Sequence, residues 1–432
     1  MKKLARICLY PAAIALLVMV YGIMFHLPSL AKTCAVLAGV FGAVGLGSVP
    51  SLKGYQYTAW IIVAVVAGMI FPQAFSQWCH VNLRDKTLIL VVVQLVMFGM
   101  GTSMSLRDFK SIAATGKGVT VGLLCQFSIM PLMGFLLTRI FHFEPEIAAG
   151  IILIGSCSSG LASNVMVYLA KANLVLSVIL TSIATLAAPL LTPLLMKLLA
   201  GTLISIHFVD MMLDIVKIVL VPIGAALLHD YLRNAASSTR KKIHSLSIAA
   251  AIWILLLVVL VLPNVSHQRM HDSLVLSGFM GGAVVAGVLY NLLVKKFPVV
   301  NEVMPLVSMF GIIYFTAVTT AAGRDNLLQV GLLLFLASVI HNAAGYFLGY
   351  WLSRLLFRMD NNDCETIALE VGLQNGGLAS GIAGSMGKLG TVGLASAVFS
   401  PWMNISGSLL ANYWRRRKQT NVTSDEPVTM KR

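Results

Sequence analysis

The chain has 432 residues, of which 58% are hydrophobic and 11% are charged, and its formal net charge is +15. In soluble domains about a quarter of all residues are usually charged. The composition of this chain therefore excludes an ordinary soluble protein and favours one that spans a lipid bilayer. The basic residues gather at the ends of apolar segments, for example at 240–242 and 415–418. That distribution is typical of cytoplasmic loops, so we expect no nucleic-acid partner.

Apolar segments near twenty residues in length recur along the whole chain and predict an all-α polytopic membrane protein with about fourteen transmembrane helices. They fall near 6–26, 31–49, 57–76, 87–104, 116–140, 145–170, 173–199, 209–231, 245–263, 274–294, 302–322, 327–352, 363–388 and 391–414. No clean cleavage pattern follows the first segment, so we interpret it as a retained helix and not as a signal peptide.

An even number of spans places both termini on one side, and the basic character of both ends predicts that this side is the cytoplasm of a bacterial inner membrane. Arg84 and Lys86, in the loop near 77–86, run against this topology. The tail at 416–432 is predicted to be polar and cytoplasmic, and disordered after Lys418.

The sequence lacks the nucleophile and metal-ligand motifs that would indicate an enzyme. The six cysteines are scattered without metal-site or disulfide spacing, which predicts small buried side chains. The chain contains no zincin motif, no phosphate-binding P-loop and no G-x-S-x-G nucleophile elbow.

The segment "LEVGLQNGGLASG" at 369–381 places polar side chains inside an apolar span. A carboxylate at this depth is costly unless it is compensated, so Glu370 is a candidate functional residue. Glu370 and Gln374 share a face of a regular helix, and glycines at 372, 376 and 377 make a break in that helix easy. A break frees backbone carbonyls, and these suit a hard cation such as Na⁺ beside carboxylate and amide oxygens.

A weak internal echo of this segment appears in the first half of the chain. "GSCSSGLASNV" contains the polar pair Ser163-Asn164 among small residues, as Gln374-Asn375 lies among glycines. Ser177 and Thr181 of the next span share one helical face. Paired glycine-interrupted spans in the two halves of a transporter indicate an inverted repeat with a binding site at the membrane midplane. Close helix packing by small residues is the alternative interpretation.

Several motifs resemble the bile acid:sodium symporter family. They are "MFGMGTSMSLRDF" at 97–109, "ASNVMVYLAKANLVLSVILTSIATLAAPLLTPLL" at 162–195, "EVGLQNGGLA" at 370–379 and "NISGSLLANYW" at 404–414. The resemblance covers roughly 57–230 and 300–415. It implies a ten-helix unit of two inverted five-helix repeats, arranged as a panel domain and a core domain, with two discontinuous helices crossing beside two sodium ions.

The resemblance also implies the roles of particular residues. The first sodium site would use Ser163, Asn164, Ser177, Thr181 and Glu370. The second would use Gln126, Glu370, Gln374 and the carbonyls of Val371 and Leu373. Asn375 and Asn404 match positions near bound organic anions, and the substrate cavity would lie on the cytoplasmic side of the crossover.

The chain departs from the family pattern in three places. The family's Pro-Gly-Gly is replaced by Ser158-Ser159-Gly160 and is followed by Leu161 in place of a hydroxyl residue, and Met403 stands where some relatives carry histidine. Both changes fall on the substrate side of the family's site, so Leu161 and Met403 join Asn375 and Asn404 as candidate substrate-binding residues. About four helices are additional, two at the N-terminus and two near 245–295. The expected organisation is therefore 1–55 for extra N-terminal helices, 56–231 for the first repeat and the first helix of the second, 240–298 for an inserted helix pair, 300–415 for the rest of the second repeat, and 416–432 for the tail.

These observations predict a sodium-coupled symporter that imports an organic anion, such as a bile acid or a pantoate-like carboxylate, by alternating access. Keto acids and sulfonates also suit an apolar cavity with a few amides. Two other hypotheses stay open at this point. Glu370 could carry protons in place of sodium, and the protein could be a receptor that binds a sterol-like anion without transporting it.

Overall fold

The computed structural model describes residues 6–49, 52, 55–78, 80–107, 112–262 and 268–424. These residues are mostly helical, as the apolar periodicity predicts, and eight of the described helices are long and apolar enough to cross a bilayer. Shorter apolar helices accompany them. The all-α membrane architecture is confirmed, and the number of spans stays a prediction.

The helices follow one another with short connections. In chain order they are α2 (Leu9–Met24), α3 (Pro28–Leu46), α4 (Gln56–Ile70), α5 (Lys86–Gly101), α6 (Ile112–Phe141), α7 (Pro145–Ser156), α8 (Leu161–Leu169), α9 (Leu174–Ala200), α10 (Phe208–Ile215), α11 (Val221–Asn234), α12 (Ser237–Leu256), α13 (Gln268–Lys296), α14 (Val299–Ala322), α15 (Arg324–Leu355), α16 (Asn361–Gly372), α17 (Gly376–Ser385) and α18 (Leu394–Ser424). Single π-helical turns, Val216–Leu220 and Leu257–Val261, follow α10 and α12.

The loop between α4 and α5 is the only part of the described chain that forms strands. A 3₁₀ turn at Pro72–Phe75 leads into β1 (Gln77–Trp78), which pairs antiparallel with β2 (Val81–Asn82). The Asp85 side chain then accepts hydrogen bonds from the backbone N–H groups of Thr87 and Leu88 and caps α5.

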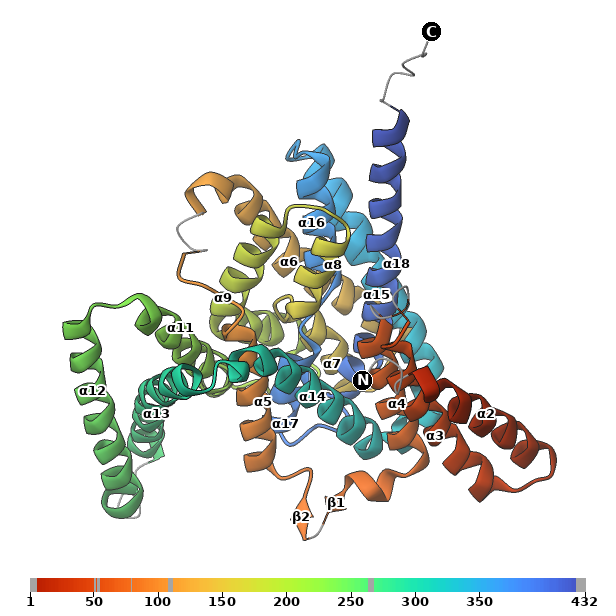
Figure 1. Ribbon diagram of the computed structural model, residues 1–432, viewed down its shortest axis with the longest axis horizontal. Helices are drawn as coiled ribbons and strands as arrows, with labels where there is room; N and C mark the ends of the chain where they lie inside the picture. Colours follow the sequence, from red (N-terminus) through yellow and green to blue (C-terminus); the bar gives the residue numbers. More distant parts are fainter. Residues whose placement is uncertain are drawn as a thin grey trace.

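Two of the predicted spans are broken in the middle. The span near 145–170 is divided into α7 and α8, and the span near 363–388 into α16 and α17. The two breaks meet, because Ser159 and Gln374 form an antiparallel bridge and the Asn375 N–H donates to the Ser158 carbonyl at 2.8 Å. Figure 1 shows these four half-helices at the centre of the molecule, with α8 and α16 above the breaks and α7 and α17 below them.

The helices outside the region of family resemblance pack at the periphery. The α2–α3 hairpin contacts α4, and α13 packs on α11 with α12 beyond it. Figure 1 shows the two pairs on opposite sides of the molecule. Tyr290 of α13 lies edge-on to Phe98 of α5 and to His229 of α11, with ring centroids 4.8 Å apart in both cases. An aromatic contact therefore anchors the inserted pair to α5 and α11.

Two helix boundaries differ from the sequence expectation. The inserted helix α12 begins at Ser237, about a turn or two before the predicted span, so the basic residues 240–242 belong to the helix. The expectation of disorder after Lys418 is wrong as far as Ser424, because α18 continues to that residue. Lys418 is held by contacts to other helices, which are described below, and this explains the added order. Residues 425–432 lie outside the described chain.

Four of the cysteines, Cys34, Cys125, Cys157 and Cys364, are buried. Cys79 lies outside the described residues. The largest apolar core is formed mainly by α5–α9 and α14–α18, and it surrounds the crossing half-helices. The polar atoms at the breaks are therefore enclosed by an apolar environment in which each of them needs a partner.

Candidate functional site

Glu370 lies at the end of α16 with none of its side chain exposed. Its Oε1 accepts a hydrogen bond from the Ser177 hydroxyl at 2.5 Å. Its Oε2 accepts from the hydroxyls of Ser159 at 2.5 Å and Thr181 at 2.8 Å. Among the described residues, no Lys, Arg or His side chain forms an ion pair with this carboxylate. The site therefore holds a buried carboxyl group whose hydrogen-bond partners are neutral hydroxyls.

Neutral side-chain oxygens from α8 and α9 surround the Glu370 carboxylate and form a first group of oxygens with it. Ser177 and Thr181 share one face of α9, as their spacing predicts, and their hydroxyl oxygens lie 2.7 and 3.3 Å from the side-chain Oδ1 of Asn164. The Ser163 hydroxyl lies 3.4 Å from that of Thr181. The five residues predicted for a first sodium site thus come together from α8, α9 and α16. One carboxylate among hydroxyl and amide oxygens is a donor set that suits a hard cation.

A second group lies where α6 meets the two breaks. The Gln126 side chain, which is fully buried, donates through Nε2 to the Cys157 carbonyl at 2.9 Å and to Gln374 Oε1 at 3.0 Å. Gln374 Nε2 in turn donates to the Val371 carbonyl at 2.7 Å. Gln126 Oε1 is buried without a hydrogen-bond donor. Because a buried acceptor without a partner is costly, this oxygen fits a position that faces a cation.

The residues predicted for the second site are therefore also close together. Gln126, Gln374 and Val371 form one chain of hydrogen bonds, and Leu373 lies at the C-terminal end of α16 beside them, fully buried. Glu370 belongs to the same helix end, which therefore carries both the central carboxylate and part of the second group of oxygens.

Two residues that contact these groups were not assigned a role from the sequence. The Ser159 hydroxyl contacts Glu370, and its only signal was the replacement of a family glycine. Asn342 of α15 donates to the Gly372 carbonyl at 2.8 Å, and it accepts from Ser406 of α18 at 2.6 Å. Asn342 thus provides a partner for a carbonyl that the break leaves without its helical donor. The sequence shows that Asn342 is a polar residue in an apolar span, but it does not show that Gly372 is its partner.

The residues predicted to contact substrate are mostly enclosed. Asn375 caps α17, because its side chain accepts from the Leu378 N–H at 3.0 Å, and 5% of its surface is exposed. Asn404 donates to the Ser400 carbonyl of its own helix at 2.7 Å. Met403 is buried, whereas Leu161 at the start of α8 is half-buried. In this conformation the Asn375 side-chain oxygen and the Asn404 side-chain nitrogen each have a backbone partner.

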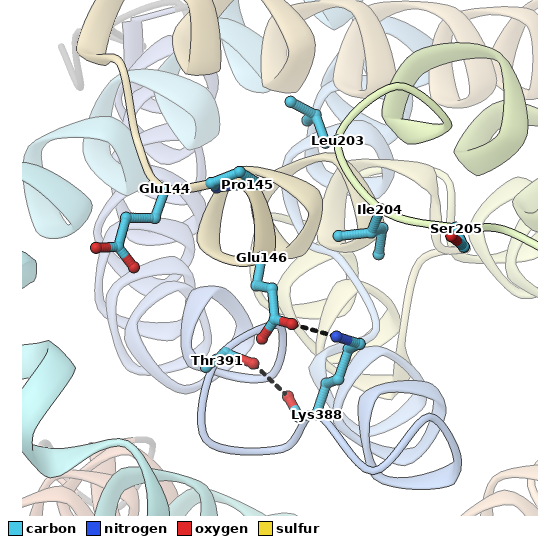
Figure 2. Close-up of a pocket in the computed structure, with 8 residues that line it drawn as sticks. All are labelled: Glu144, Pro145, Glu146, Leu203, Ile204, Ser205, Lys388 and Thr391. Atoms are coloured by element: carbon cyan, nitrogen blue, oxygen red, sulfur yellow. Dashed lines mark hydrogen bonds and ion pairs between the residues drawn. The ribbon is translucent and has the colours of Figure 1, made fainter.

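A pocket of about 530 Å³ lies at the outer end of α7, away from the Glu370 group. Figure 2 shows it between the start of α7, the segment 203–205 after α9 and the loop that precedes α18. Its charged residues are Glu144, Glu146 and Lys388, and Lys388 is paired with Glu146. Because the cation of this pocket already has a carboxylate partner, the pocket lacks a free positive charge for an anion.

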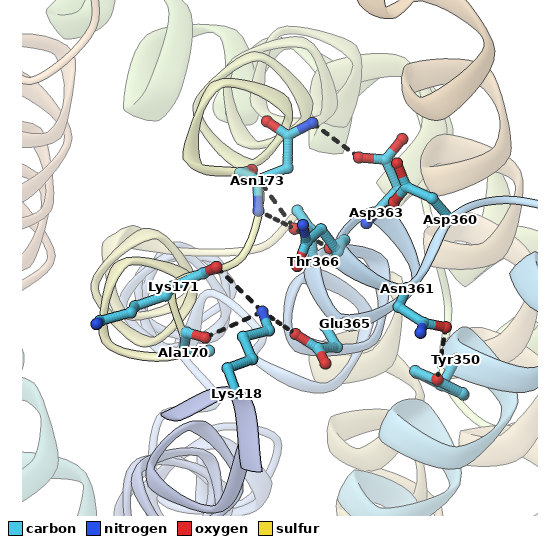
Figure 3. Close-up of polar contacts among 11 residues, drawn as sticks. Ala170, Lys171, Asn173, Tyr350, Asp360, Asn361, Asp363, Glu365, Thr366 and Lys418 are labelled. Carbon is cyan, nitrogen blue, oxygen red and sulfur yellow. Dashed lines mark hydrogen bonds and ion pairs between the residues drawn. The ribbon is translucent and has the colours of Figure 1, made fainter. Parts of the chain in front are cut away.

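Lys418 of α18 contacts the ends of α8 and α16 that lie away from the breaks. Lys418 Nζ lies 2.6 Å from Glu365 Oε2 of α16, and it donates to the carbonyls of Ala170 and Lys171 after α8, at 3.2 and 3.0 Å (Figure 3). Asn173, also drawn in Figure 3, donates to Asp363 at 2.7 Å. These contacts hold the C-terminal end of α8 and the N-terminal end of α16 together. They also supply a hydrogen-bond donor to carbonyls at the C-terminus of α8, which have no partner within the helix.

Comparison with known proteins identifies the family of this chain. Residues 90–271 match the model of the sodium bile acid symporter family. The chain is 33% identical over 367 residues to YocS, an uncharacterised sodium-dependent transporter of Bacillus subtilis, with 84% of this chain and 92% of YocS covered. It is 26% identical to a probable sodium/metabolite cotransporter, chloroplastic BASS1 of Arabidopsis thaliana, over 83% of this chain and 73% of that one. A stretch of 93 residues, 22% of this chain and 27% of the relative, is 39% identical to the human ileal sodium/bile acid cotransporter. The chain therefore belongs to the sodium bile acid symporter family.

Proposed function

We propose that this protein is a sodium-coupled symporter that imports an organic anion by alternating access. The observation that carries the proposal is the environment of Glu370. Its carboxylate is fully buried, receives hydrogen bonds from neutral hydroxyls, and has no basic ion-pair partner within the described chain. A buried charge of this kind needs a compensating cation. The sodium-dependent relatives support sodium as that cation.

Two groups of oxygens support two sodium ions. Ser163, Asn164, Ser177 and Thr181 would hold one ion with Glu370. Gln126, Gln374 and the carbonyls of Val371 and Leu373 would hold the other, and the unpaired Gln126 Oε1 supports this assignment. When bound, the ions supply positive charge beside Glu370. The hydroxyl and amide shells favour sodium over proton coupling, because a proton site needs only the carboxylate.

The substrate region lies on the other side of the crossover. The α17 helix begins at Gly376, directly after Asn375, and its N-terminus presents a positive dipole end that suits a carboxylate or sulfonate. We assign Asn375, Asn404, Leu161 and Met403 to this region. Asn375 belongs to the same helix break as the candidate sodium ligand Gln374. A movement of the candidate sodium ligands would therefore be coupled to opening of the substrate region.

The arrangement of helices supports a division into a panel and a core domain. The core would contain α6–α9 and α15–α18, with both broken helices, and the panel would contain α4, α5, α10–α11 and α14. The additional helices contact α4, α5 and α11, so they would enlarge the panel. We propose fourteen spans in a bacterial inner membrane with both termini in the cytoplasm. The transporter relatives also indicate that the protein is not an enzyme.

Transport by the purified protein in proteoliposomes tests this proposal. A thermal-shift screen of organic anions with and without sodium first selects the probe, beginning with a bile acid and with pantoate. Uptake of the labelled probe should require an inward sodium gradient, and Glu370→Ala should abolish it while the protein still inserts.

Three outcomes contradict the proposal. Uptake that is driven by a pH gradient in sodium-free buffer favours proton coupling. Binding without counterflow exchange favours a receptor. Sodium-dependent uptake that persists undiminished in Glu370→Ala contradicts the role of the carboxylate.

A further inference from the structure

Ser159 is a residue at which this chain differs from its family's motif, and the difference places a hydroxyl on the central carboxylate. In the family motif that this segment resembles, the position is glycine, which has no side chain. Here the Ser159 hydroxyl donates to Glu370 Oε2 at 2.5 Å and lies 3.3 Å from the Thr181 hydroxyl. The adjacent Ser158 behaves differently, since its hydroxyl lies 3.1 Å from that of Thr185. The contact with Glu370 is therefore particular to Ser159.

The backbone fixes the position of this hydroxyl. Ser159 forms the antiparallel bridge with Gln374, which joins the two breaks. On its N-terminal side, the Ser158 carbonyl accepts from the Asn375 N–H, and the Cys157 carbonyl accepts from Gln126. Ser159 is fully buried. Its hydroxyl is thus held by a segment that contacts both groups of candidate sodium ligands.

The three donors to Glu370 come from two different directions. Ser177 and Thr181 belong to α9, whereas Ser159 belongs to the crossover itself. Without Ser159, the carboxylate would lose its contact with the crossover and keep the hydroxyl donors of α9. A hydroxyl donates one hydrogen and keeps two lone pairs, so Ser159 can hold Glu370 and still accept a contact.

We propose that Ser159 is a positioning residue of the sodium sites. It holds the Glu370 carboxylate between the two groups of oxygens, and it thereby raises the affinity for sodium above the level that glycine at this position would give. This inference rests on the proposed sodium-coupled function.

The proposal predicts the effect of removing the hydroxyl. Ser159→Ala deletes only one oxygen, and Ser159→Gly restores the residue of the family motif. A hydrogen bond to a charged group is strong enough to change a binding equilibrium about ten-fold. Both variants should therefore raise the apparent Kd for sodium about ten-fold. Equal effects of the two variants would exclude backbone flexibility as the cause.

Ser156→Ala is the matched control. Ser156 is also fully buried and lies close in sequence, but its hydroxyl donates to the Ile152 carbonyl of its own helix at 2.8 Å. Its removal should leave the sodium Kd within about two-fold of the wild type, since it deletes a hydrogen bond to a neutral group away from Glu370.

The measurement is the thermal stability of the purified full-length protein in detergent as sodium chloride replaces choline chloride at constant ionic strength. The increase in melting temperature with sodium gives the apparent Kd. A wild type that responds to sodium, with weaker sodium binding in Ser159→Ala and Ser159→Gly but not in Ser156→Ala, supports the inference. A wild type that responds while all variants bind sodium equally overturns the role of Ser159 alone. A wild type that is stabilised no more by sodium than by choline overturns the proposed function, and this inference with it.

Discussion

Replacement of Glu370 by glutamine separates the contribution of this side chain to stability without sodium from its contribution to stabilisation by sodium. The variant removes the charge and keeps the shape. Without sodium, two effects oppose each other. The three hydroxyl donors lose a charged acceptor, and since hydrogen bonds to charged groups contribute about 1 kcal/mol more than neutral ones, the loss is about 3 kcal/mol. The variant also removes a buried charge without a basic partner, whose burial costs several kcal/mol.

These terms offset each other, so we expect the sodium-free Glu370→Gln protein to be about as stable as the wild type. The difference should arise with sodium. A ligand at one hundred times its Kd stabilises the folded state by about 2.7 kcal/mol, and the wild type should gain this amount. The variant should gain none, because the carboxylate that both groups of oxygens share is gone.

Glu365→Gln provides the control on the same helix. Glu365 is paired with Lys418 at 2.6 Å, so its neutralisation should destabilise the protein with and without sodium and leave the sodium response intact. The assay is the melting temperature in detergent across a sodium titration against choline. A strongly destabilised sodium-free Glu370→Gln, or one that still responds to sodium, would refute this reasoning.

Two further predictions concern the second group of oxygens and the contacts of α18. Gln126→Leu removes the unpaired oxygen and the donor to Gln374, so the Hill coefficient of sodium-dependent stabilisation should fall from about two to about one; an unchanged coefficient would exclude Gln126 as a ligand. Lys418→Met removes the ion pair with Glu365 and two contacts to carbonyls, and it should lower stability by about 1–3 kcal/mol. Sodium titration of this variant should give a Kd within about two-fold of the wild type, and a larger change would show that the α18 contacts influence the sodium sites.

The local sequence was sufficient for the features that depend on neighbouring residues. Hydropathy located the helical segments, because burial in lipid requires apolar side chains along the whole of each span. The spacing of Ser177 and Thr181 placed both on one face of α9, and the glycines around Gln374 indicated a break. The depth of Glu370 marked it as the central carboxylate, since an intramembrane charge is costly without a partner.

The tertiary structure decided which distant residues meet. Ser159 and Glu370 are 211 residues apart, and Gln126 and Gln374 are 248 apart, so no local pattern relates them. The continuation of α18 to Ser424 has the same origin, because Lys418 contacts the end of α8 and the start of α16. A periodic sequence specifies which face of a helix is buried, but the partner of each buried polar atom depends on how the helices cross. In this protein the crossing of two broken helices brings the hydroxyl of Ser159 to the carboxylate of Glu370.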